Sequence, residues 1–150
     1  MTDSTGTTSY GYDVLNRLTS ESSPSSEVRY SYDAAGNLIS YDDLRAVGDA
    51  INYGYNAANL LTSVTEYPSG RQTTFVYDAD HLRTQTNYPN GVSMFFTYDG
   101  SNRLTRVLGK KPASGEVLTD FVYSWTNGQG QDTGLRQSVT DKNGNRTSYT

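Results

Sequence analysis

The segment that decides the fold is Tyr30–Ile39, which reads Tyr-Ser-Tyr-Asp-Ala-Ala-Gly-Asn-Leu-Ile. Tyr30 and Tyr32 are two residues apart, so in a strand they share one face while the small serine between them faces the other way. Asp33 ends that strand, where its side chain can accept backbone N–H groups further along the chain and begin a tight turn. Gly36 suits the left-handed conformation that closes such a turn. The segment therefore predicts a β-hairpin.

The same pattern recurs along the chain. Its second aromatic residue returns after 20, 23, 22 and 21 residues, counted from Tyr12 to Tyr98. The aromatic pairs of the five copies are Tyr10 and Tyr12, Tyr30 and Tyr32, Tyr53 and Tyr55, Phe75 and Tyr77, and Phe96 and Tyr98. The acids that follow these pairs are Asp13, Asp33, Asp78 and Asp99, with Asn56 in the third copy. Five copies at near-constant spacing indicate a tandem array.

A sixth copy is degraded but recognisable. Tyr123 and Trp125 take the aromatic positions, residues 126–133 form an enlarged loop, and Gly134 takes the turn position. Across the copies, the residue expected to have a positive φ belongs to the types that tolerate it best. These residues are Asn16, Gly36, Asn59, His81, Asn102 and Gly134. Tyr149 then begins a seventh copy.

The predicted fold is all-β, with tandem hairpins stacked side by side into a curved strip or partial shell. One hairpin is marginally stable alone, so stability has to come from neighbours, and a wide sheet must twist. We expect the tyrosine rings of successive hairpins to stack on one another as the core. The expected repeats of this single array, residues 1–150, are approximately 5–24, 25–48, 49–70, 71–91, 92–115 and 116–144, with a truncated seventh from 145. The sequence reads as a piece of a longer array.

Composition agrees with a thin core and excludes several classes of protein. Leu, Ile, Val and Phe number 27 of the 150 residues, but there are 13 Tyr, and the net charge of −4 is low for a disordered chain. No apolar run is long enough for a transmembrane span, and the first residues do not resemble a signal peptide. The chain has no cysteine, so it has neither disulfides nor a thiolate nucleophile. A pI near 4.8 argues against nucleic-acid binding.

The run from Tyr32 to Leu38 and its sister copies resemble the YD repeat of the Rhs-repeat family. That family includes bacterial Rhs and wall-associated polymorphic toxins, the B and C components of insecticidal Tc toxin complexes, and the teneurins. The resemblance implies hairpins that spiral into a hollow shell, which in toxin members encloses a C-terminal toxic domain and in teneurins serves adhesion. The chain departs from the pattern at Asn56, at His81 and in the sixth copy, which lacks the acid. No segment resembles the family's self-cleaving region, so we expect a piece of shell wall.

Catalytic and metal-binding interpretations compete with this structural one. His81 is the only histidine, so a Ser-His-Asp triad would need it, yet its repeat position predicts a turn residue. The repeated aspartates could form the carboxylate pair of a glycosidase, but each recurs with a turn, which favours turn capping. Asp78, Asp80 and His81 match no standard metal site, and the segment Asp141–Asn145 lacks the closing acid of a calcium loop. We therefore expect no catalytic residue, no cofactor and no metal.

Carbohydrate binding is the other alternative, because tyrosines alternate with arginines along the chain. Neutral sugars stack on aromatic rings and fit a net charge of −4 better than nucleic-acid bases, which require a positive groove. The arginines concerned are Arg17, Arg29, Arg71, Arg83 and Arg103. The competing interpretation is that the rings are buried against one another as the core.

The sequence thus predicts a non-enzymatic structural segment of an Rhs-type β-shell that encloses or shields an attached toxin or effector domain. The expected partners are the remainder of a larger exported protein and its toxin domain, and open hairpin edges predict self-association. The expected localisation is secreted or at the cell surface. A carbohydrate-binding or adhesive β surface is the alternative, and a glycoside-cleaving enzyme is a more distant one.

Overall fold

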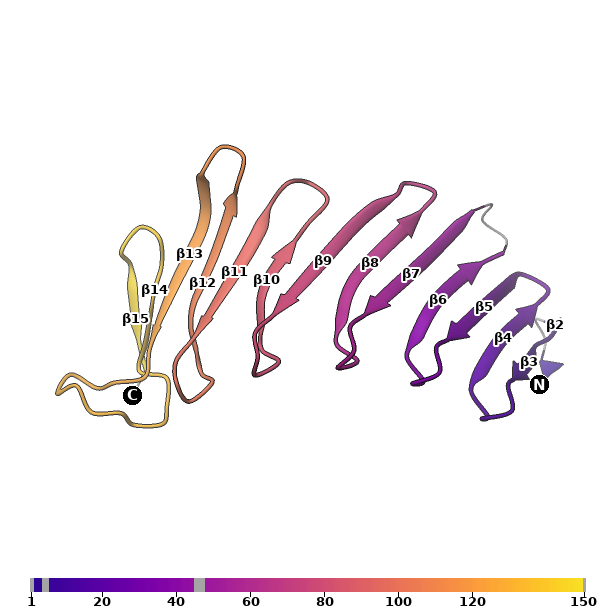
Figure 1. Ribbon diagram of the computed structural model, residues 1–150, viewed down its shortest axis with the longest axis horizontal. Coiled ribbons are helices and arrows are strands. Elements are labelled where there is room, and N and C mark those ends of the chain that lie inside the picture. The colour runs from indigo at the N-terminus through magenta and orange to yellow at the C-terminus, as the bar shows by residue number, and fades with distance from the viewer. Residues whose placement is uncertain (1, 4–5, 45–47, 150) are drawn as a thin grey trace. The chain divides into compact units, whose positions relative to one another are not determined.

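The structure, a computed structural model, describes residues 2–3, 6–44 and 48–149, which form β-strands joined by turns and loops (Figure 1). In this part of the chain, no helix is long and apolar enough to span a membrane. The chain divides into two compact units, residues 1–74 and residues 75–150. The predicted all-β fold of hairpins side by side is confirmed.

The first unit contains β1 to β8 and the start of β9. β1 and β2 pair with each other, whereas the strands from β3 onwards pair with their neighbours in chain order, all antiparallel. The bounds are β1 (Thr2–Asp3), β2 (Gly6–Thr7), β3 (Ser9–Tyr12), β4 (Leu18–Ser23), β5 (Ser26–Tyr32), β6 (Leu38–Asp43), β7 (Asp49–Tyr55), β8 (Leu61–Tyr67) and β9 (Arg71–Tyr77).

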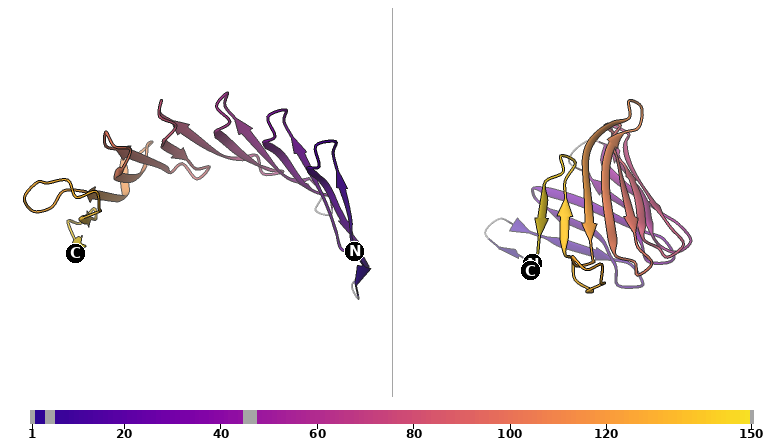
Figure 2. Two further views of the ribbon diagram at one scale, coloured as in Figure 1. Left: turned by 90° about the horizontal axis from the view of Figure 1, so that it is seen from below. Right: turned by 90° about the vertical axis from the view of Figure 1, so that its left-hand side faces the viewer.

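The second unit contains the end of β9 and the strands after it, again hydrogen-bonded in chain order. Their bounds are β10 (Arg83–Asn87), β11 (Ser93–Tyr98), β12 (Leu104–Lys111), β13 (Glu116–Ser124), β14 (Ser138–Thr140) and β15 (Arg146–Ser148). Within each unit the hairpins form a single layer of strands (Figure 2). Both faces of each sheet are therefore available to solvent or to partners.

The two faces of the first unit differ in polarity. Tyr30 of β5 pairs with Tyr41 of β6, which pairs with Ile51 of β7, and the two tyrosine rings meet edge to face with centroids 5.7 Å apart. One residue further along, Ser31 pairs with Ser40, and this row lies on the opposite face because side chains alternate along a strand. Aromatic side chains thus gather on one face and small hydroxyl side chains on the other.

Few side chains are fully buried in either unit. Among the described residues, the buried apolar side chain is Val28 of β5, which is 7% exposed. Thr86, Ser93 and Ser138 are the buried polar residues, all in the second unit. Each hairpin therefore depends on half-buried contacts with the next hairpin rather than on a dense core. The positions that make those contacts define the candidate site.

Candidate functional site

The turn between β5 and β6 shows how one repeat is closed. Oδ1 of Asp33 accepts the amide of Asn37 at 2.8 Å, and the Asp33 carbonyl accepts the amide of Gly36 at 3.1 Å. Gly36 has a φ of 92°, the left-handed region that glycine enters without strain. The Asn37 side chain donates to the second carboxylate oxygen, which lowers the pKa of Asp33 below its usual value. The carboxylate is thus used to hold the turn.

The same turn recurs among the described residues wherever Oδ1 of an Asp or Asn accepts the amide of the fourth residue on. These Asp and Asn residues are Asp13, Asn56, Asp78, Asp99, Asn127 and Asp141. The residue before that amide has a φ of 58° to 84°, and these residues are Asn16, Asn59, His81, Asn102, Gly130 and Gly144. His81 and the repeated aspartates therefore lie in turns. This is the structural role that the sequence analysis set against a catalytic role for them.

The enlarged loop of the sixth hairpin contains an additional turn that the sequence interpretation missed. Thr126 and Asp132 pair across a β-bridge, and Asn127 and Gly130 close the turn between them. Gly134 has a φ of 69°, but its amide donates to Oδ1 of Asp132 at 2.9 Å. Asn127 and Gly130 have the spacing of an acid and its turn glycine in a regular repeat, and this spacing could have identified the turn.

A second recurring contact joins each hairpin to the one before it. The second aromatic residue of the pair donates a hydrogen bond to a backbone carbonyl at the start of the outgoing strand of the preceding hairpin. The bonds run from Tyr32 to Leu18 (2.9 Å), from Tyr55 to Leu38 (3.0 Å), from Tyr98 to Arg83 (2.9 Å) and from Trp125 Nε1 to Leu104 (3.0 Å). Burial in these contacts raises the pKa of Tyr55 and of Tyr98. We call each such contact a junction.

A feature of the sequence that the repeat analysis left unused indicates the junctions. The second aromatic position always carries a hydrogen-bond donor, whereas the first position also accepts Phe, as in Phe75 and Phe96. The residues at the second position are Tyr12, Tyr32, Tyr55, Tyr77, Tyr98 and Trp125. Tyr12 is the exposed member, at 60%, and its strand β3 lies at the edge of the sheet. The donor requirement explains why the second aromatic position carries Tyr or Trp and never Phe.

Arginine side chains pack on several of the aromatic rings, in addition to the ring contact between Tyr30 and Tyr41. The Arg83 guanidinium lies 5.8 Å from the Phe75 ring and 5.1 Å from the Phe96 ring, so it bridges the first aromatic positions of consecutive hairpins. Arg17 lies 4.6 Å from the Tyr32 ring. A guanidinium over an aromatic face is attracted by the ring quadrupole and leaves its polar edge hydrated, which suits a half-exposed seam.

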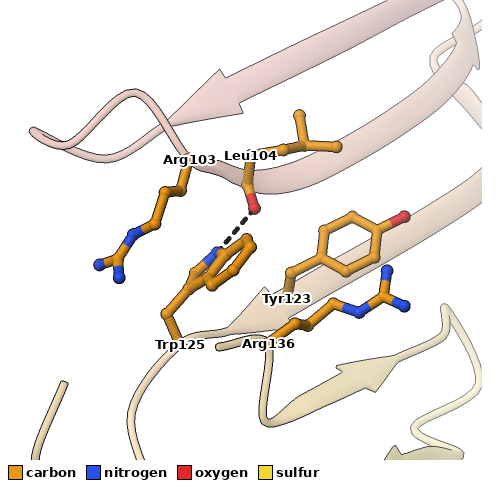
Figure 3. A pocket seen from close by; sticks show the side chains of 5 residues that line it. All are labelled: Arg103, Leu104, Tyr123, Trp125 and Arg136. Carbon is orange, nitrogen blue, oxygen red and sulfur yellow. Dashed lines mark hydrogen bonds between the residues drawn. The ribbon is translucent and has the colours of Figure 1, made fainter. Parts of the chain in front are cut away.

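The sixth hairpin uses these contacts to form a pocket of about 480 Å³ (Figure 3). Its lining residues are Arg103, Leu104, Tyr123, Trp125 and Arg136. Trp125 lies centrally, with its indole N–H bound to the Leu104 carbonyl. The Arg103 guanidinium lies 5.0 Å from the Trp125 ring. The pocket therefore combines an aromatic surface with two cationic side chains.

The two arginines of this pocket are in different electrostatic situations. Arg103 forms ion pairs with Asp99 at 2.8 Å and with Asp132 at 2.7 Å, and its hydrogen bonds lower the pKa of Asp132 to about 2. Arg136 is exposed and lies 5.6 Å from the Tyr123 ring and 4.6 Å from the Tyr149 ring. Within the described part of the chain, no carboxylate forms an ion pair with Arg136. Arg136 thus supplies the uncompensated charge.

This chain is similar to known proteins in sequence pattern and in fold. The family model for the RHS repeat matches residues 16–50 and 55–93. No curated protein matches the sequence. The crystal structure of TcdB2-TccC3-TEV is 16% identical with a TM-score of 0.75, covering 99% of this chain and 9% of that one. The Tc holotoxin pore of Photorhabdus luminescens is 20% identical with a TM-score of 0.65, covering 78% and 5%.

The crystal structure of TcdB2-TccC3 is also similar, at 16% identity and a TM-score of 0.73 over 93% of this chain and 8% of that one. At such identities the likeness shows a shared fold. The chain spans less than a tenth of the length of these structures. The repeated hairpins and their turns define a tandem-repeat β protein of the Rhs type. The chain belongs to the Rhs/YD-repeat family.

Proposed function

We propose that the chain is a non-enzymatic wall segment of an Rhs-type shell that encloses or shields an attached toxin or effector domain. The observation that supports this most directly is the junction, made by Tyr32, Tyr55, Tyr98 and Trp125. Its acceptor is a backbone carbonyl, which any residue provides, so hairpins of different sequence can be added in series. A wall built in this way acts by steric exclusion and requires no catalytic group.

The proposal includes the setting of the wall. Its partners are the remainder of a larger exported protein and that protein's toxin domain, and its location is secreted or at the cell surface. Across both compact units the chain is a single array with the repeat limits given above. The similarity in fold to TcdB2-TccC3 and to a Tc holotoxin pore supports this setting.

Protease protection tests containment. The full-length protein that contains this chain is treated with a nonspecific protease, and the survival of its attached domain is compared with that of the same domain expressed alone. Containment predicts survival only in the full-length protein, and loss of protection when Tyr55→Ala removes one junction. Equal cleavage in both settings contradicts the proposal, and so does a parent protein with no attached domain.

A carbohydrate-binding or adhesive surface is the second candidate function. The observation that favours it is the pocket at Trp125, because a half-buried indole beside a tyrosine offers part of a flat apolar surface to a sugar ring. Binding of the isolated chain to a glycan array tests this candidate. Loss of that binding on Trp125→Ala, with the fold retained, would support it.

Glycoside cleavage is the more distant candidate. The repeated aspartates that could supply a carboxylate pair are bound to turn amides, as Asp33 is to the amide of Asn37. Hydrolysis of a polysaccharide that disappears when one aspartate is changed to Asn would overturn the non-enzymatic proposal.

Self-association through the open strand edges is the last element of the proposal. The edge strands β3 and β15 each have one hydrogen-bonded neighbour in the described sheet. Unpaired edges of this kind favour pairing between copies. Sedimentation should show dimers or larger species as concentration rises, and a clean monomer at high concentration would contradict this element.

A further inference from the structure

The pocket at Trp125 exists because the sixth hairpin departs from the regular repeat. In regular hairpins the residue after the left-handed position can be half-buried, as Leu60 and Leu82 are. The corresponding residue of the sixth hairpin, Leu135, is 71% exposed. The extra turn over residues 126–132 separates Leu135 from Trp125 in the sequence, and Trp125, which lines the pocket, is half-buried.

The position of Arg136 within the repeat is also informative. It lies two residues after the left-handed residue of its hairpin, and that position is otherwise leucine except in the fourth hairpin, which has Arg83. The leucines are Leu18, Leu38, Leu61 and Leu104. The scaffold therefore accepts leucine at this position, and the arginine is not required for the fold. Arg136 and Arg83 are each packed between two aromatic rings, but of these two arginines it is Arg136 that lines the pocket at Trp125.

The charged side chains around the pocket indicate which kind of ligand would fit it. The charge of Arg103 is balanced by Asp99 and Asp132, whereas that of Arg136 is not balanced by any carboxylate in the described residues. An aromatic floor with one available guanidinium suits a ligand that has an apolar ring face and one anionic group. The volume of about 480 Å³ is within the range of roughly 300–1,000 Å³ typical of small-ligand sites.

We propose that this pocket binds a carboxylate-bearing sugar, with the sugar ring on Trp125 and the carboxylate on Arg136. The proposal rests on the carbohydrate-binding candidate function and adds the chemical class of the sugar. A single-stranded nucleic acid would also combine stacking with negative charge, but it requires a line of positive charge along its backbone, and the pocket lining provides one unpaired cation, Arg136.

The chain contains a built-in reporter for the test, because Trp125 is its one tryptophan. Indole fluorescence is titrated with a trimer of galacturonic acid and, separately, with the neutral trimer of galactose. The acidic trimer should change the emission and bind at least ten times more tightly than the neutral one. Raising the salt concentration should weaken its binding, because the contact with Arg136 is exposed.

Three variants separate a specific site from general attraction. Arg136→Leu restores the common repeat residue and should weaken the acidic trimer at least tenfold, leaving the circular dichroism spectrum unchanged. The matched control Arg83→Leu makes the same substitution at the equivalent position of another hairpin and should leave binding unchanged. Trp125→Tyr keeps the junction donor but reduces the stacking surface, so calorimetry should show weaker binding of both trimers.

The possible failures are distinguishable. If Arg83→Leu and Arg136→Leu weakened binding of the acidic trimer equally, only net charge would matter. That result would overturn the proposal that the pocket is the binding site. If both trimers bind equally and Arg136→Leu has no effect, the acidic-sugar inference is wrong while carbohydrate binding stands. If neither trimer binds, the acidic-sugar inference is overturned, and a glycan array without any binder removes the candidate function as well.

Discussion

The hairpins β5–β6 and β13–β14 make the same contact with the preceding hairpin, but their turns differ in size. In β5–β6, Asp33 and Gly36 close a tight turn, and the Tyr32 hydroxyl donates to the carbonyl of Leu18. In β13–β14 the chain makes an additional turn before returning, yet Trp125 still donates to the carbonyl of the preceding hairpin. The difference teaches that the junction is independent of the turn. Insertions can therefore be accepted at the turn while the seam between hairpins is kept.

Removing the junction residue should have the largest effect and should be similar in both hairpins. Tyr32→Ala and Trp125→Ala each remove a half-buried ring, its arginine contact and its hydrogen bond, so each should lower the free energy of unfolding by about 2–3 kcal/mol. Urea unfolding followed by circular dichroism measures this. Tyr12→Ala, at the exposed edge, is the control and should cost much less. A large loss of unfolding free energy for Tyr32→Ala with almost none for Trp125→Ala would show that the two hairpins do not depend equally on their junctions.

The left-handed glycines should show the next largest effect. Gly36 and Gly130 have φ values of 92° and 77°, and a methyl group at either position would meet no atom within 4 Å. Alanine there should cost about 1–2 kcal/mol through the backbone alone. Gly100, in another turn, also has open space but no left-handed backbone, so Gly100→Ala is the matched control. Equal stabilities for the Gly36 and Gly100 variants would show that the conformation does not matter.

Shortening the sixth hairpin to a regular turn should have a smaller effect on stability. Replacing residues 126–133 with Asp-Gly-Ser, the sequence that follows Tyr98, restores regular spacing before Gly134. The free energy of unfolding should change by less than about 1 kcal/mol, because loop length and one exposed ion pair each contribute little. The same variant should lose binding of the acidic trimer. Collapse of the fold would show that the inserted turn is structural.

The pH dependence that comes from Asp132 should be the smallest effect, and it adds to that of turn aspartates such as Asp33, whose pKa is also lowered. The Arg103 hydrogen bonds lower the pKa of Asp132 to about 2 from 3.8, so folding favours the ionised form. This contribution is complete above pH 3.8 and is lost as the pH falls through 2. The Asp132 carboxyl carbon, followed by NMR, should titrate near 2, and Arg103→Gln should return it towards 3.8. An unshifted pKa in the unmodified protein would mean that the loop is not held by this pair.

The sequence was sufficient to predict the hairpins because a repeat displays its physical requirements several times. The occupants of the left-handed position, such as Asn16, Gly36 and His81, share little except tolerance of positive φ, which made their role predictable. The acceptors of the junctions are backbone carbonyls, which leave no mark in the sequence, so only the donors were visible there, as the Tyr or Trp at each second aromatic position. The division into two compact units was not predicted, because the residue composition does not change at the boundary between them.

The pocket could not be predicted because it depends on where an inserted loop places its neighbours. Arg103 and Asp132 are 29 residues apart in sequence, and nothing in the repeat pattern pairs them. Arg136 has the same place in the repeat as Arg83, so only the exposure of Leu135 and the lining of the pocket distinguish the two arginines. Such differences arise from three-dimensional packing rather than from local preference.

The junction has a direction, because the donor always belongs to the later hairpin and the acceptor to the earlier one. A chain that emerges from the ribosome exposes its acceptor carbonyls first. Each new hairpin therefore meets an acceptor carbonyl that has already been synthesised, and its junction does not depend on residues still to be synthesised. The array is suited to growth by one hairpin at a time during translation, with the last folded hairpin as the template for the next.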